Sequence, residues 1–154
     1  MFKINIISNN KNWKLYLNKP DIYIQKKIKN LNKKIKEHKR KNIFFTLLLS
    51  GNNEIKKLNK RFRKKNKVTD ILSFPFYEKK DLKESLKKEK EIYLGDIILN
   101  LNKIKYKSDK KKFKLEVNKL WIHGLVHLFG HNHKTNKDYF NMQKLEKKFL
   151  SYID

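Results

Sequence analysis

The sequence predicts a single α+β domain over residues 1–154, with a roughly four-stranded mixed sheet and four to six helices. Four segments are short, apolar and rich in β-branched or aromatic residues, as strands are. The longer segments show the 3.6-residue period of helices. Because the two types do not alternate strictly, α+β is favoured over α/β. A chain of 154 residues suits one domain rather than two.

The first third of the chain contains two predicted strands and two predicted helices. Residues 2–7 alternate in polarity like a strand, and residues 42–50 form a short apolar run typical of a buried strand. Isoleucine and leucine recur at helical spacing within residues 22–40. A second helix is expected over about residues 53–63.

The middle of the chain contains the other two predicted strands, over residues 70–76 and 92–101. Pro75 lies in the first of them, and proline favours a place near the sheet edge because it cannot donate to a ladder. Residues 79–91 are charged and poor in large apolar side chains. We expect them to form a mobile surface loop or a solvated helical turn.

Two helices are expected in the last third of the chain. The first, over about residues 110–130, has a wide apolar stripe with Gly124 in its middle, where a missing side chain permits close approach to a neighbour. The second, over about residues 136–152, is expected to turn its apolar side chains inward. These are Tyr139, Met142, Leu145, Phe149 and Tyr152.

The composition is strongly basic, with 40 Lys and Arg against 15 Asp and Glu and a formal net charge of +25. A positive field of this size attracts polyanions such as RNA, DNA or anionic lipid. An AT-rich genome produces the same excess of lysine, asparagine and isoleucine, and the only arginines are Arg40, Arg61 and Arg63. The charge therefore leaves the choice between function and genomic bias open.

The chain has no cysteine, which excludes disulfides and thiolate metal sites. Its first residues lack the apolar core of a signal peptide, and no run reaches the roughly 18–20 apolar residues that span a bilayer. We expect a soluble, cytoplasmic protein without a membrane partner.

Four of the five histidines lie in one stretch, "HGLVHLFGHNH" (123–133). His123 and His127 are four residues apart, so on a helix their rings emerge from the same side. Gly130 can end that helix in a left-handed conformation, after which His133 can approach the same point. Three converging neutral imidazoles predict a catalytic-type zinc site at the C-terminal end of a central helix.

The same spacing is found in the zinc-peptidase pattern H-E-x-x-H-x-x-G-x-x-H, with one difference. Gly124 occupies the position at which a peptidase needs the glutamate that accepts a proton from water. Glycine cannot act as a general base. The metal ligands are thus predicted without peptidase chemistry.

The stretch resembles the signature H-G-x-x-H-L-x-G-[YF]-D-H of the YbeY family, bacterial metal-dependent endoribonucleases of rRNA maturation and ribosome quality control. Two further blocks are similar to those of the family in order and spacing. "LNKRFRKKNKVTDILSFPF" (58–76) resembles L-N-x-x-[YF]-R-x-K-[DN]-x-x-T-D-V-L-S-F-P-F, and "YLGDIILN" (93–100) resembles L-G-D-I-x-I-[SN].

The resemblance implies a single-strand-specific endoribonuclease that acts on the 3′ end of small-subunit rRNA. It implies that His123, His127 and His133 bind one zinc ion and that Arg63 is important for activity. An arginine suits that role because its planar fork grips a phosphate through two hydrogen bonds. The implied partners are single-stranded RNA and the small ribosomal subunit or its proteins. Other divalent transition metals also bind His₃ sites.

Five further residues lie within or next to these motifs. His131 is expected at the surface or behind the ligands, and it stands where the family has an aromatic residue. Asn132 replaces the family's aspartate, and we expect the loss of that negative charge to affect activity more than metal binding. Asp70 and Asp96 are expected to make structural hydrogen bonds rather than act as bases, and Ser73 could line the cleft.

Three other functions stay open at this point. One is a metallohydrolase of another substrate, including a peptidase, against which Gly124 argues. The second is a non-catalytic, zinc-containing ribosome-assembly factor. The third is a nucleic-acid-binding protein that acts through charge alone, whose binding would disappear at moderate salt and depend on no histidine.

Overall fold

The computed structural model describes residues 1–154, which form one α+β domain as predicted. No helix in this fold combines the length and the apolar character that a bilayer span requires. The elements in chain order are β1 (Phe2–Ser8), α1 (Trp13–Tyr16), α2 (Pro20–Lys34), β2 (Asn42–Ser50), α3 (Asn52–Arg63), β3 (Ile71–Pro75), α4 (Lys79–Lys88), β4 (Glu91–Asn100), the short 3₁₀ helix η1 (Leu101–Lys103), α5 (Lys110–Leu128) and α6 (Asn136–Ile153).

The four strands form one mixed sheet in the order β1-β2-β4-β3. β1, β2 and β4 run parallel, and β3 pairs antiparallel with β4. β3 is therefore an edge strand, as Pro75 predicted. In the register of this pair, Ile71 lies opposite Leu99 and Pro75 lies opposite Gly95.

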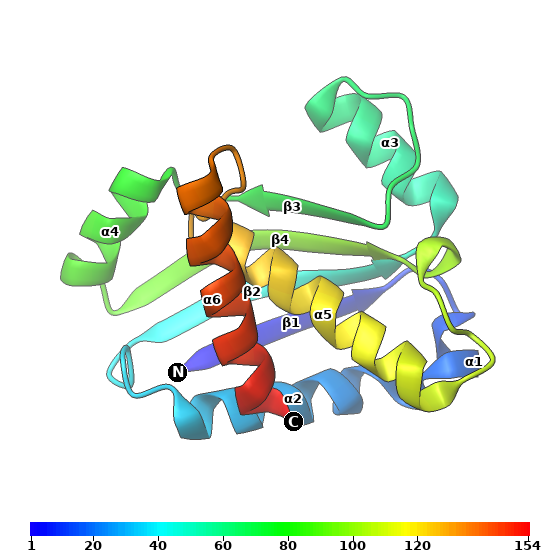
Figure 1. Cartoon of the computed structure of the whole chain (residues 1–154), viewed down its shortest axis with the longest axis horizontal. Helices are drawn as coiled ribbons and strands as arrows, with labels where there is room; N and C mark the ends of the chain where they lie inside the picture. Colours follow the sequence, from blue (N-terminus) through cyan, green and yellow to red (C-terminus); the bar gives the residue numbers. More distant parts are fainter.

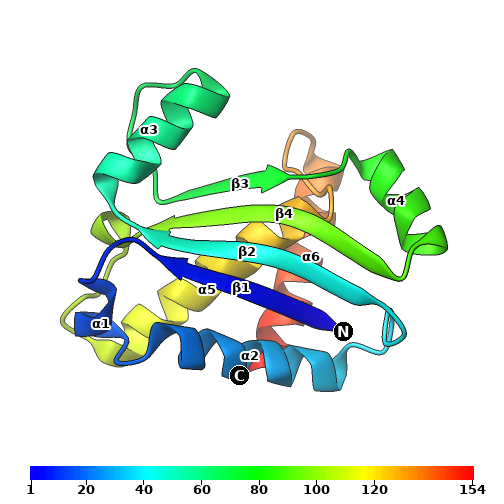
Figure 2. The same cartoon turned by 180° about the vertical axis from the view of Figure 1, so that it is seen from behind.

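Helices α5 and α6 cover one face of the sheet, with α2 beside β1 (Figure 1). On the opposite face no helix crosses β1 or β2, and α3 lies at the corner next to β3 (Figure 2). Alternate residues of β2 are buried toward the covered face, and each fully buried apolar side chain contributes about 1.5–3 kcal/mol. They are Ile43, Phe45, Leu47 and Leu49.

Gly124 allows α5 to approach the sheet closely. A Cβ atom at this position would lie 2.7 Å from Cγ2 of Ile97 on β4 and 3.1 Å from Cδ1 of Ile71 on β3. Only glycine fits here without a shift of these two isoleucines, as the sequence predicted. This contact sets the height of α5 over β3 and β4, and with it the position of the neighbouring His123.

The two ends of α5 are defined by local signals. At its start, Oδ1 of Asp109 accepts hydrogen bonds from the backbone N–H groups of Lys111 and Lys112. At its end, Gly130 has a φ of +81°, the left-handed conformation predicted for it. The chain reverses there, so the residues that follow return toward the last turns of the helix.

The mobile loop expected over residues 79–91 was wrong, and the alternative of a helical turn is closer to the structure. Residues Lys79–Lys88 form α4, and β4 already begins at Glu91. Leu82 is 2% exposed within the main core, and Leu86, four residues later on the same helix face, packs against it. Lysine and glutamate are good helix formers, so two leucines suffice to dock this charged segment.

Two details of the other helices also differ from the prediction. The helix expected over residues 22–40 ends at Lys34, because Ile35 adopts an extended conformation and is buried in the core. Tyr139, expected to point inward, is 48% exposed. It lies in the first turn of α6, before that helix reaches the core, whereas Ile153 at the other end is fully buried.

Candidate metal centre

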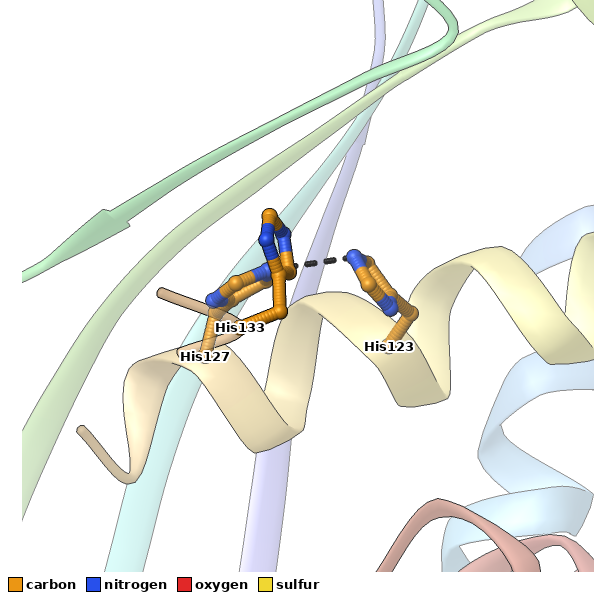
Figure 3. A group of neighbouring side chains, drawn as sticks. All are labelled: His123, His127 and His133. Atoms are coloured by element: carbon orange, nitrogen blue, oxygen red, sulfur yellow. Dashed lines mark hydrogen bonds between the residues drawn. The ribbon is translucent and has the colours of Figure 1, made fainter. Parts of the chain in front are cut away.

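Three imidazole rings converge at the end of α5 (Figure 3). His123 and His127 come from successive turns of α5, and His133 comes from the segment that follows the reversal at Gly130. One nitrogen from each ring lies within 4.8 Å of the other two. The helical spacing of the first two histidines and the left-handed glycine together produce this convergence.

The Nδ1 atoms of two of these rings are already engaged in hydrogen bonds. Nδ1 of His123 lies 2.7 Å from Oε1 of Glu146 on α6. Nδ1 of His127 lies 2.9 Å from the backbone carbonyl oxygen of His131. A carboxylate and a carbonyl only accept hydrogen bonds, so both Nδ1 atoms carry the proton and donate. In the neutral imidazoles, each Nε2 therefore presents a lone pair.

The Nε2 atoms of His123 and His127 lie 3.1 Å apart. Two lone pairs at this distance repel, and a metal ion bound by both nitrogens would remove that repulsion. Two nitrogens bound about 2.0–2.1 Å from one tetrahedral zinc ion are about 3.3 Å apart. The third imidazole, His133, brings a third nitrogen within 4.8 Å of the other two, as a metal site requires. These residues fit a divalent transition metal.

The electrostatics of His127 also suit a metal ligand. Burial, followed by the charge of the neighbouring His123, lowers the pKa of His127 to about 4. The ring is therefore neutral at pH 7, the form that binds metals. Burial and the charge of Lys79 lower the pKa of His131 as well.

A cleft of about 550 Å³ adjoins the histidines. It brings together residues from α3, β3, α4 and the end of α5, and Glu78 is its only acidic residue. The lining residues are Arg63, Ser73, Pro75, Phe76, Tyr77, Glu78, Lys79, His127, Gly130, His131, Asn132 and Lys134. The cleft is therefore basic and open to one of the three histidines, His127.

Arg63 is held at the rim of this cleft by the edge strand. Its Nη2 donates a 3.0 Å hydrogen bond to the backbone carbonyl of Ser73, and its guanidinium lies 5.7 Å from the centre of the Phe74 ring. A guanidinium has five N–H donors, so most of them stay available to a ligand. Arg63 and His127 thus face one cleft although α3 and α5 are far apart in sequence.

The remaining polar residues that the sequence suggested fall into two groups, those that line the cleft and those that make local hydrogen bonds in or next to the sheet. Ser73, His131 and Asn132 line the cleft, and the carbonyl of His131 orients His127. Asp70 and Asp96 make local hydrogen bonds instead, with the hydroxyls of Thr69 and Tyr93 respectively.

Sequence reasoning missed Glu146. It lies on α6, 23 residues after His123, and touches that ring through the tertiary packing of two helices. One signal could have identified it. Glu146 falls between the buried residues Met142 and Phe149, so an acidic side chain lies on the face that α6 turns toward α5.

Comparison with protein-family models decides the assignment, because the model described as "Endoribonuclease YbeY" matches residues 7–154. The chain belongs to the YbeY family. A protein of Pelagibacter ubique named Endoribonuclease YbeY is 41% identical to this chain, over 99% of the chain and 97% of that protein. A protein of the same name from Malacoplasma penetrans is 35% identical, over 90% and 85%.

A solved structure shares the fold. The solution structure of TM1509 from Thermotoga maritima superposes with a TM-score of 0.59 at 25% identity, and the match covers 98% of this chain and 89% of that one. Membership of the YbeY family agrees with the resemblance of the three sequence blocks. Two of these blocks, residues 58–76 and 123–133, supply most of the cleft and the whole histidine cluster.

The departures from the YbeY signature lie in the turn after α5. Oδ1 of Asn132 accepts a hydrogen bond from the backbone N–H of Lys134, a contact that a carboxylate also makes. The backbone carbonyl of His131 contacts His127, and a carbonyl is present whatever side chain stands there. Neither replacement removes a hydrogen bond on which the geometry of the turn depends.

Proposed function

We propose that this chain is a zinc-dependent endoribonuclease specific for single strands. The observation that carries the proposal is that Nε2 atoms of His123 and His127 face each other beside His133, next to a basic cleft that also holds Arg63. Family membership supports the RNA-cleaving activity. The chemistry of the three imidazoles supports the metal.

His123, His127 and His133 would hold the ion and leave its remaining position to water or substrate. When bound, zinc lowers the pKa of water and polarises a phosphoryl oxygen. The protein would contribute Arg63, which lines the cleft and whose guanidinium would neutralise the charge that develops on the phosphate. Gly124 supplies no general base, which sets this site apart from a zinc peptidase.

The proposed substrate is ribosomal RNA, at the 3′ end of the small-subunit rRNA, in maturation and ribosome quality control. Lys79 and Lys134 line the cleft beside Arg63, so contacts with the sugar–phosphate backbone would dominate binding. Such contacts carry little sequence information. Selectivity would then depend on RNA shape or on the small ribosomal subunit and its proteins as partners, in the cytoplasm.

Metal analysis combined with RNA cleavage tests the proposal. The wild type, His123→Ala and Arg63→Ala are stripped of metal, reloaded with Zn²⁺ and incubated with single-stranded and double-stranded forms of one labelled RNA. We expect the histidine variant to lose metal and cleavage together, and the arginine variant to keep metal and lose cleavage. Cleavage by the stripped wild type, or equal cleavage by all three proteins, would contradict it.

A further inference from the structure

We propose that Glu146 is a positioning residue for the metal centre, acting through His123. The inference rests on the proposed metal site and concerns a residue of α6 that lies outside the ligand motif. Its carboxylate oxygen lies 2.7 Å from Nδ1 of His123, short for a hydrogen bond that involves a nitrogen donor. The Glu146 side chain is 23% exposed and that of His123 is 34% exposed, so the contact is partly shielded from solvent.

The packing of α6 directs Glu146 toward the histidine. Met142 and Phe149, one turn before and one turn after Glu146, are buried at 2% and 6% exposure and fix the rotation of the helix. Two residues later, Lys148 points elsewhere and pairs with Glu37. Glu146 pairs with His123 rather than with any of the many lysines.

This contact determines the protonation pattern that a ligand needs. Because the carboxylate accepts only, the His123 proton stays on Nδ1 and the Nε2 lone pair points at Nε2 of His127. Carboxylate–histidine pairs of this kind fix ring orientation and raise ligand basicity, and their loss typically weakens metal binding by about 10–100-fold.

The charge of Glu146 distinguishes its role from that of the partner of His127. Three imidazoles offer no negative charge to a divalent cation, and His127 is oriented by the neutral carbonyl of His131. Glu146 supplies a negative charge directly behind one ligand. We therefore expect both its hydrogen bond and its charge to contribute to zinc affinity.

The test uses the full chain as wild type, Glu146→Gln and Glu146→Ala. The near-isosteric glutamine keeps an oxygen acceptor and removes the charge. Glu37→Gln is the matched control, since Glu37 is also an acid paired with α6 but contacts no ligand histidine. Zinc affinity is measured by competition with a chelator. The tautomer of His123 is read from its ¹⁵N chemical shifts in the metal-free protein.

We expect zinc affinity to fall by about 10–100-fold in Glu146→Ala, with an intermediate loss in Glu146→Gln and none in Glu37→Gln. In metal-free protein, His123 should keep its proton on Nδ1 in the wild type and in Glu146→Gln, and become a tautomer mixture in Glu146→Ala. Unchanged affinity or an unchanged tautomer in Glu146→Ala would overturn the inference, as would an equal loss in Glu37→Gln. Failure of the wild type to bind zinc would instead overturn the proposed function.

Discussion

The Nε2 atoms of His123 and His127 lie 3.1 Å apart, each on a ring whose Nδ1 donates to an oxygen acceptor. These hydrogen bonds keep the proton of each ring on Nδ1 and leave the lone pair on Nε2. One is made to a side chain of α6 and the other to the backbone of the turn after α5. Because one acceptor is a side chain and the other is a backbone carbonyl, side-chain substitutions should affect the two contacts differently.

Replacing His127 and replacing His131 should have opposite outcomes. His127→Ala removes one of the three proposed ligand nitrogens, so we expect bound zinc and RNA cleavage to be lost together. His131→Ala keeps the backbone carbonyl that accepts from His127, so zinc should be retained. Metal content after dialysis and the cleavage rate are the measurements. Loss of zinc in both variants would show that the His131 ring itself is needed.

Arg63 should matter for cleavage but not for metal binding. Arg63→Ala removes the guanidinium next to Ser73, and we expect cleavage to fall by about 10²–10³-fold with zinc content unchanged. Arg63→Lys should recover only part of the rate, because a lysine cannot form the planar fork. Arg61→Ala is the control, since Arg61 stacks on Phe62 and does not line the cleft. Equal losses in the Arg61 and Arg63 variants would indicate a nonspecific charge effect.

The metal-free protein should lose stability as the pH falls from about 6.5 to about 4. The pKa of His127 is lowered to about 4 in the native state by burial and is about 6.5 in the unfolded chain. Between these values the unfolded state binds a proton that the native state does not, so the free energy of unfolding decreases with decreasing pH. Urea unfolding at a series of pH values measures the slope.

His127→Gln provides the comparison for this pH dependence. Glutamine does not titrate, so the variant should show a shallower loss of stability over the same pH interval. The net charge of +25 is nearly the same in both proteins, and its general repulsion therefore cancels in the difference. Parallel curves for the two proteins would contradict the burial of a neutral His127.

Gly124→Ala should destabilise the domain by about 1–3 kcal/mol, because an added Cβ would lie 2.7 Å from Cγ2 of Ile97. The better helix propensity of alanine offsets up to about 1 kcal/mol of this loss. A double-mutant cycle with Ile97→Ala tests the contact by denaturant unfolding. The second substitution should make Gly124→Ala less costly, and additive effects would rule out the proposed clash.

The sequence alone was sufficient for features that depend on near neighbours in the chain. Apolar alternation placed the strand at residues 42–50, and helical spacing placed His123 and His127 on one face. A glycine in left-handed conformation ended α5, as its position predicted. These features follow from backbone sterics and from the 2.0 and 3.6 residue periods, which act over a few residues.

Only the tertiary structure decided which distant residues meet at the site. α4 depends on two leucines that pack into a core formed by other segments. The many charged residues around these leucines give no local sign of that packing. Arg63 reaches the cleft because β3 lies at the sheet edge, where the carbonyl of Ser73 is free to accept its hydrogen bond. Glu146 reaches His123 because α6 packs against α5. Such contacts depend on how the elements pack. The periodicity of a sequence shows which face of a helix is apolar, but not which element that face packs against.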